Sequence, residues 1–136
     1  MVQVPSITAI YLAVLALIYT GLAAQTVRLR RLNRAAFGDA GSPELRSAIR
    51  GHAHFAEYVP IIVLMLAMLE MSGVAAYRIH ALMGALVVAR VLHPIGMYAK
   101  PGTTAFRIGR FGGMVLTIAV LVSAALLILV RFALSR

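Results

Sequence analysis

Two groups of ionisable residues lie inside long apolar stretches of this 136-residue chain. Arg50, His54 and Glu57 are spaced so that they share one face of a helix, and so are Arg90 and His93. An isolated charge in the middle of a bilayer costs at least about 2.5–3.5 kcal/mol, so such residues persist where they are paired or line a site. We expect Glu57 to face Arg90 in the interior of a helical bundle, either as an ion pair that fixes helix register or as part of a site. Arg50 and His54 lie above Glu57 on the same helix and would open this site toward one membrane surface.

Other kinds of site fit the residue set less well. The chain has no cysteine, which excludes disulfides, thiolate–zinc sites, iron–sulfur clusters and a cysteine nucleophile. His52 and His54 could bind a metal ion, and His54 and His93 could ligate haem from facing helices. No cluster of carboxylates or cysteines accompanies these histidines, so we expect no metal site.

The elements that must position these residues are membrane-spanning helices. Apolar residues make up 62% of the chain and charged residues 12%, whereas average soluble domains have roughly 45–50% and about 25%. This balance excludes a soluble globular domain and a disordered chain, and the length allows four spans of about 20 residues each. The apolar segments are too long for strands and do not alternate, so we predict an all-α membrane protein, a four-helix transmembrane bundle. We expect a single domain over residues 1–136, with spans at about 5–27, 51–72, 77–98 and 108–132.

The distribution of charge predicts the orientation of this bundle. The net charge of +9 would suggest nucleic acid in a soluble protein, but in a membrane protein the Lys and Arg residues of the connections set the topology. Nine basic residues lie in or beside the connections after the first and third spans, and three lie on the opposite side. We therefore expect the first and third connections in the cytoplasm, both termini outside, and no nucleic-acid partner.

Two smaller expectations concern the ends of the helices. Ser42 is expected to cap a short helical turn in which Pro43 takes the first position. Glu70 lies at the outer end of the second span, and we expect it to form a boundary ion pair with Arg78 or His80.

Several stretches of the sequence resemble one known family. The most specific is RGHAHFAEYVP at residues 50–60, and it is accompanied by VRLR at 27–30, FGD at 37–39 and RVLH at 90–93. Together these stretches resemble the MAPEG family, the membrane-associated proteins in eicosanoid and glutathione metabolism. They look closest to its small members in the bacterial inner membrane. The resemblance implies a homotrimer with glutathione as co-substrate, bound between neighbouring subunits near the cytoplasmic side.

The functional residues of the family carry over to individual positions of this chain. Arg28 matches an arginine that contacts or activates the thiol, and Arg107 matches an arginine proposed to stabilise the thiolate. Six further positions match residues of the glutathione site: Arg50, His54, Glu57, Arg90, His93 and Tyr98. This chain departs from the family pattern at His54, where the family often has asparagine. Tyr98 is displaced by one position, and Phe111 stands where the family has a tyrosine.

The resemblance implies a glutathione-dependent transferase or peroxidase that acts on lipophilic electrophiles. Arginine suits this chemistry, because a guanidinium stays protonated and lowers the pKa of a nearby thiol from about 8.5. The expected partners are glutathione, a lipophilic small molecule or lipid, and the membrane lipids. An alternative is a non-catalytic lipid-binding or scaffolding membrane protein of the same fold. A small four-span exporter is disfavoured, because such proteins carry a carboxylate in the first span and none precedes Asp39 here.

Overall fold

The computed structural model describes residues 4–133 and places them in four long helical segments. Each segment is long and apolar enough to cross a membrane, and residues 4–133 contain no β-strand. The prediction of an all-helical protein with four candidate spans is therefore confirmed. The elements are α1 (Ser6–Leu32), α2 (Pro43–Met71), α3 (Ala76–Tyr98), α4 (Thr104–Phe106), η1 (Arg107–Gly112), α5 (Gly113–Ile128) and η2 (Leu129–Ala133). The last four elements follow one another without a break as the fourth segment, in which η1 and η2 are stretches of π-helix.

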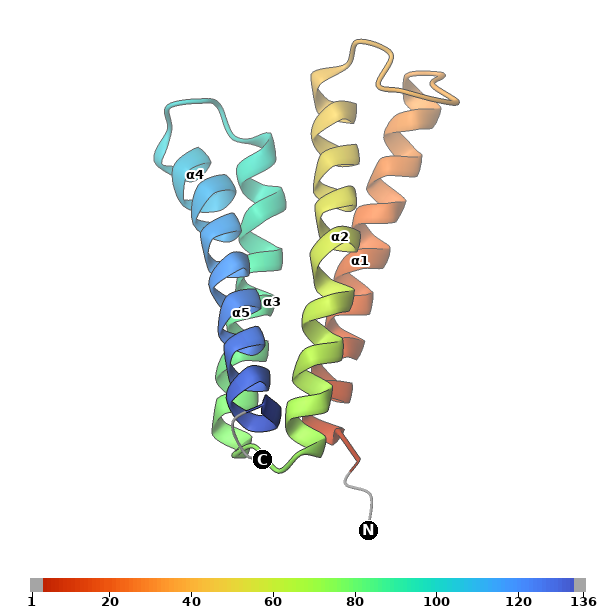
Figure 1. Cartoon of the computed structure of the whole chain (residues 1–136). Helices are drawn as coiled ribbons and strands as arrows, with labels where there is room; N and C mark the ends of the chain where they lie inside the picture. The colour runs from red at the N-terminus through yellow and green to blue at the C-terminus, as the bar shows by residue number, and fades with distance from the viewer. Residues whose placement is uncertain (1–3, 134–136) are drawn as a thin grey trace.

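The helices form a bundle whose two ends carry different connections (Figure 1). α1 packs beside α2, α3 packs beside α5, and the two pairs meet along α2 and α3. The connections at residues 33–42 and 99–103 lie at one end of the bundle. The turn between α2 and α3 lies at the other end, together with the start of α1 and the end of η2. The two arginine-rich regions of the sequence therefore lie at the same end.

The first two helices extend beyond their apolar stretches into the connection between them. α1 continues through Arg28 to Leu32, and α2 already begins at Pro43. Ser42 caps α2, because its Oγ accepts a hydrogen bond of 3.2 Å from the N–H of Leu45. Pro43 follows in the first turn, where its missing N–H would have had no helical partner. The expected cap is present, but it starts a helix of 29 residues rather than a short turn.

The core of the bundle is apolar. Its fully buried side chains include Leu15, Ile62, Leu66, Met83 and Leu86. Large apolar side chains also point outward along every span, as is usual for a surface that faces lipid or another helix in a membrane.

Glycines bring α3 and the fourth segment into backbone contact. A Cβ atom at Gly96 would overlap the backbone of Gly109 and Arg110, and one at Gly109 would overlap the backbone of Gly96. Small residues at such a crossing let two helices approach closely in a membrane. At the same crossing, a Cβ atom at Gly113 would lie 3.0 Å from the Cβ of His93. The crossing therefore holds His93 directly against the fourth segment.

Glu70 connects the end of α2 to the start of α1. Its carboxylate accepts hydrogen bonds of 2.8 Å from the N–H groups of Ile7 and Thr8, and one of 2.7 Å from the Thr8 hydroxyl. α1 has no capping side chain at its own N-cap, Pro5, so its first amides need an acceptor from elsewhere. Glu70 forms no ion pair within residues 4–133, so the expected boundary ion pair is wrong. The buried carboxylate caps a neighbouring helix instead.

Candidate functional site

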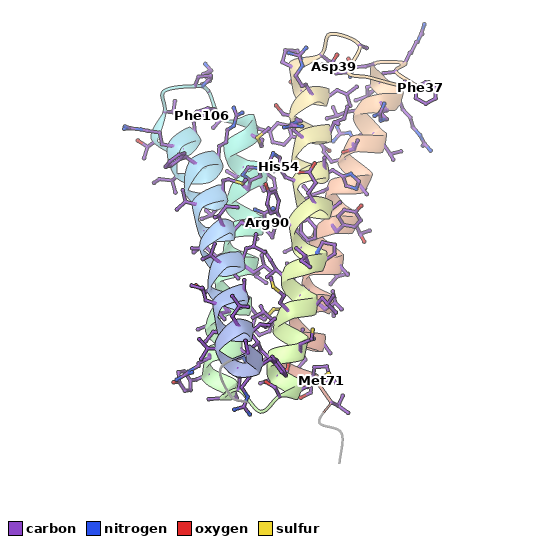
Figure 2. The ribbon with its side chains drawn as sticks, viewed as in Figure 1. Phe37, Asp39, His54, Met71, Arg90 and Phe106 are labelled. Atoms are coloured by element: carbon purple, nitrogen blue, oxygen red, sulfur yellow. The ribbon has the colours of Figure 1, made fainter. Side chains whose placement is uncertain are left out.

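Arg90 lies at the centre of a polar cluster inside the bundle (Figure 2). Only 1% of this residue is exposed. Its Nη1 donates to the backbone carbonyl of His54 in α2 at 3.3 Å, and its Nη2 donates to the hydroxyl of Thr117 in α5. The Thr117 hydroxyl in turn donates to the carbonyl of Gly113 at 2.8 Å. Through these bonds Arg90 of α3 ties three of the four segments together.

Two histidines complete this cluster. His93 Nδ1 lies 3.2 Å from the carbonyl oxygen of Arg110 and donates to it, because a carbonyl oxygen only accepts. The His93 ring lies 4.9 Å from the His54 ring, edge to face, and the His54 ring stacks on Tyr58 at 5.9 Å. Three buried nitrogens of the described residues make no hydrogen bond: His54 Nδ1, Arg90 Nε and His93 Nε2. The cluster therefore contains three polar atoms whose hydrogen-bonding capacity the described residues leave unused.

Glu57 does not face Arg90, so that part of the sequence prediction is wrong. The Glu57 side chain is 55% exposed, and its Oε2 lies 3.9 Å from His54 Nδ1. The buried stripe of α2 passes through Phe55 and Val59, and Glu57, two residues from each, points to the opposite side of the helix. Arg90 binds the backbone carbonyl of His54 where a carboxylate was expected, and no carboxylate in residues 4–133 forms an ion pair with it.

The other predicted site residues lie on the outside of the chain. Arg28 in the last two turns of α1, Arg50 in α2 and Arg107 at the start of η1 are exposed, and Tyr98 at the end of α3 is 47% exposed. The structure thus brings the two histidines and Arg90 together, with Glu57 beside them on the outer face of α2. The remaining four residues do not reach this cluster from within one chain.

Thr117 is a polar partner of Arg90 that sequence reasoning missed. It is fully buried in the fourth segment, where an apolar stretch gave no reason to single it out. A hydroxyl inside a helix usually bonds the carbonyl four residues earlier, as Thr117 also does, so its type alone predicts no partner in another helix. The one available signal was that Thr117 and Ser123 are the two polar side chains between Phe111 and Val130.

An apolar groove runs between α1 and α2 on the other side of the core. Its volume is about 620 Å³, within the range of about 300–1,000 Å³ that is typical of small-molecule sites. The groove is lined by residues that include Leu12, Leu15, Tyr19, Phe55, Val59 and Val63. Near its end toward the arginine-rich connections, the Tyr19 ring stacks on His52 at 4.6 Å. Within residues 4–133, no three His, Asp or Glu side chains lie together as metal ligands would.

The sequence matches the MAPEG family over residues 8–130. This chain belongs to the MAPEG family. The match spans the polar cluster and most of all four segments, and it confirms the resemblance at the level of the family.

Two relatives are inner membrane proteins of one species. The inner membrane protein YecN of Escherichia coli strain K12 is 34% identical over 94 residues, which cover 69% of this chain and 72% of YecN. YecN of Escherichia coli O6:H1 strain CFT073 shows the same identity and coverage. No solved structure matches the chain. The family, the four candidate spans and the similarity to YecN confirm the predicted location, an integral protein of the inner membrane.

Proposed function

We propose that this MAPEG protein is a membrane-bound, glutathione-dependent transferase or peroxidase that acts on lipophilic electrophiles. The observation that carries the proposal is the polar cluster around Arg90, a buried cation beside nitrogens without hydrogen-bond partners. The same stretch of α2 carries Arg50 and Glu57 on its exposed surface. At a rise of about 1.5 Å per residue these two charges lie about 10 Å apart along the helix, a separation that suits the carboxylate and amine ends of glutathione.

Arginines at the same end of the bundle would activate the thiol. The thiol of glutathione has an ordinary pKa near that of cysteine, about 8.5. Arg28 and Arg107 are exposed, and a guanidinium next to the thiol lowers its pKa by stabilising the thiolate. In transfer to an aryl halide, the thiolate sulfur bonds to the ring carbon and the halide leaves with its electron pair. The thiol proton is released to solvent when the thiolate forms.

We propose that the site is completed by a second copy of the chain in a homotrimer. The support is the exposure of Arg28, Arg50 and Arg107, none of which reaches the Arg90 cluster within one chain. The excess of basic residues favours a cytoplasmic location for this end and an outside location for both termini. Glutathione would then enter from the cytoplasm, and the lipophilic substrate would enter from the bilayer through an apolar surface such as the α1–α2 groove.

Glutathione binding by the purified full-length protein tests the proposal directly. We expect saturable binding at millimolar concentration or below by titration calorimetry, and conjugation of a chlorodinitrobenzene above the uncatalysed rate. No binding at millimolar glutathione would contradict the proposal.

Arg107 gives a sharper kinetic test. Arg107→Ala is expected to lower kcat at neutral pH by roughly 100-fold, the usual loss when one stabiliser of developing charge is removed. Because the thiol pKa returns toward about 8.5 in this variant, the lost rate should recover as the pH is raised. Arg107→Lys should keep part of the activity, since it keeps the charge. Arg110→Ala removes the same charge from the same segment, and an equal loss in that control would contradict a specific role for Arg107.

The apolar groove supports a second candidate function, a non-catalytic lipid-binding or scaffolding protein. A groove of about 620 Å³ with an almost entirely apolar lining would hold a lipid chain without any contribution from Arg107 or glutathione. Co-purified lipid in a protein that binds no glutathione would favour this candidate over the enzyme.

A further inference from the structure

Two adjoining clefts lie at the C-terminal end of α1, outside the polar cluster. The first, of about 480 Å³, is lined by Ala24, Val27, Arg28, Arg31 and Leu32. The second, of about 320 Å³, is lined by Val27, Arg30, Arg31, Arg34, Ala35 and Ala36. Both clefts share Val27 and Arg31, so Arg31 lies between two hollows that each combine guanidinium groups with small apolar side chains.

The arginines of these clefts differ in the contacts that they make. Arg30 Nη1 points back to the carbonyl oxygens of Ala35, Ala36 and Gly38, at 3.4, 3.3 and 3.2 Å, and so holds the chain that forms the wall of the second cleft. Arg31 and Arg34 are exposed, and neither forms an ion pair within the described residues. Their charges are therefore available to an anion from outside the chain.

Exposed apolar side chains flank the same arginines. Val27 is 48% exposed, Leu32 67% and Phe37 92%. Figure 2 shows Phe37 at the outer edge of the connection between α1 and α2. Exposure of these apolar side chains to water costs free energy, and contact with the hydrocarbon layer removes this cost. Guanidinium groups at the end of a span reach the level of the lipid phosphates. A soluble anion would need only the arginines, so the combination indicates an amphiphilic anion.

We propose that the two clefts bind the headgroup of an anionic phospholipid. Arg31 and Arg34 contact its phosphate oxygens, and Leu32 and Phe37 pack against the upper part of its acyl chains. A role of these arginines in membrane topology alone would require only an excess of basic residues on one side. Such a role explains neither the two clefts nor the exposed Phe37. The proposal goes beyond the glutathione-dependent activity and does not depend on it.

Lipid retention by the full-length protein tests this site. The protein is equilibrated with equal amounts of phosphatidylglycerol and phosphatidylcholine in mixed micelles, and the lipids that remain bound are counted by native mass spectrometry. We expect the wild type to retain phosphatidylglycerol preferentially. Arg31→Gln with Arg34→Gln should reduce the preference by about tenfold or more, because each substitution removes a direct charge-assisted contact with the phosphate, and one such contact is worth about tenfold.

A matched control separates a specific site from bulk charge. Lys100→Gln with Arg110→Gln removes two charges from the same end of the bundle without touching either cleft, and it should keep the preference. An equal loss in both double variants, or no loss in the Arg31 and Arg34 variant, would overturn the proposal. If inorganic phosphate that supplies the same amount of negative charge displaces the lipid, the clefts bind a soluble anion. This outcome would also overturn the proposal.

A spin label tests the same site with every arginine in place. Because the chain has no cysteine, Phe37→Cys introduces a single position for labelling. In vesicles of phosphatidylglycerol we expect this label to be more accessible to oxygen, which partitions into lipid, than to a water-soluble nickel chelate. Greater accessibility to the chelate would place residue 37 in water and would refute the lipid contact.

Discussion

At the scale of single residues, Arg90 is a charge that forms no ion pair with a carboxylate of residues 4–133. Its guanidinium stays protonated, so its burial depends on hydrogen bonds to acceptors that are neutral: the His54 carbonyl and the Thr117 hydroxyl. Both acceptors have other roles, since the first lies inside α2 and the second also donates to Gly113. Arg90 links three of the segments through these bonds, but its charge is expensive to bury, so its net contribution to stability is expected to be small.

Replacement of Arg90 by an apolar side chain should therefore separate stability from binding. Arg90→Met keeps the length of the side chain and removes the charge, so the melting temperature in detergent should stay unchanged or rise. Glutathione affinity should fall by at least about tenfold, because a hydrogen bond to a charged group contributes about 1.5–3 kcal/mol. The two quantities are measured by thermal denaturation and by calorimetry. A lower melting temperature with unchanged affinity would show that Arg90 serves only the fold.

Asp39 predicts how the connection between α1 and α2 responds to pH. The hydrogen bond from Arg46 at 2.5 Å, followed by that from the backbone of Gly41, lowers the pKa of the Asp39 carboxyl below its usual range. A carboxyl with a lowered pKa stabilises the folded connection fully above its ordinary pKa of about 3.9, and this stabilisation is lost as the pH falls through the lowered value.

The protection of the amides of residues 38–42, which is their exchange rate relative to the intrinsic rate at each pH, should accordingly be constant between pH 5 and 8. It should fall below about pH 4. Asp39→Asn should show the reduced protection of these amides already at neutral pH. Protection that persists at low pH in the wild type would contradict the role of the Asp39–Arg46 ion pair.

At the scale of elements, the Glu70 cap decides how α1 is held. Glu70→Ala leaves the amides of Ile7 and Thr8 without their acceptor and should lower the free energy of unfolding by about 1–3 kcal/mol. Glu70→Gln keeps an oxygen acceptor and should lose less. Glu57→Gln neutralises an exposed carboxylate of the same helix and should change stability by about 0.5 kcal/mol or less. Thermal or denaturant unfolding in detergent distinguishes these variants, and equal losses in Glu70→Ala and Glu57→Gln would refute the cap.

The contrast between Ser42 and Glu70 shows which element features the sequence can predict. The Ser42 cap was expected, because the capping residue and Pro43 are adjacent in the chain. The Glu70 cap was not expected, because the carboxylate and the amides that it binds are 62 and 63 residues apart. Spacing predicts which residues of one helix share a face, but it does not determine how each helix is rotated about its axis. That rotation is set by the packing of residues such as Phe55, and it turned Glu57 outward.

At the scale of the whole molecule, the four segments could be predicted because each is a continuous apolar stretch, and a membrane leaves few alternatives to a helix. The site could be predicted only in part. The Arg90 cluster assembles within one chain, whereas Arg50 and Arg107 remain on its surface. In the proposed homotrimer a second copy would complete the site, and no pattern within one sequence tells which surfaces would come together.

Mixed oligomers test whether the proposed site spans two chains. Arg50→Ala and Arg107→Ala should each be nearly inactive alone at neutral pH. If the two residues act from different copies, coexpression in equal amounts should restore roughly a quarter of the wild-type activity, the share of interfaces with both residues intact under random mixing. Conjugation of an aryl halide by the purified mixture is the measurement. No recovery would place both residues in the site of one chain.

The Glu70 cap also has a consequence for the order in which the protein is made. The amides of Ile7 and Thr8 leave the ribosome more than sixty residues before the carboxylate that they bind. During synthesis these amides of the first span therefore lack their acceptor until the last turn of the second span is made. The first two spans are in this sense one unit of biogenesis, and the nascent first helix depends on a residue that has not yet been translated.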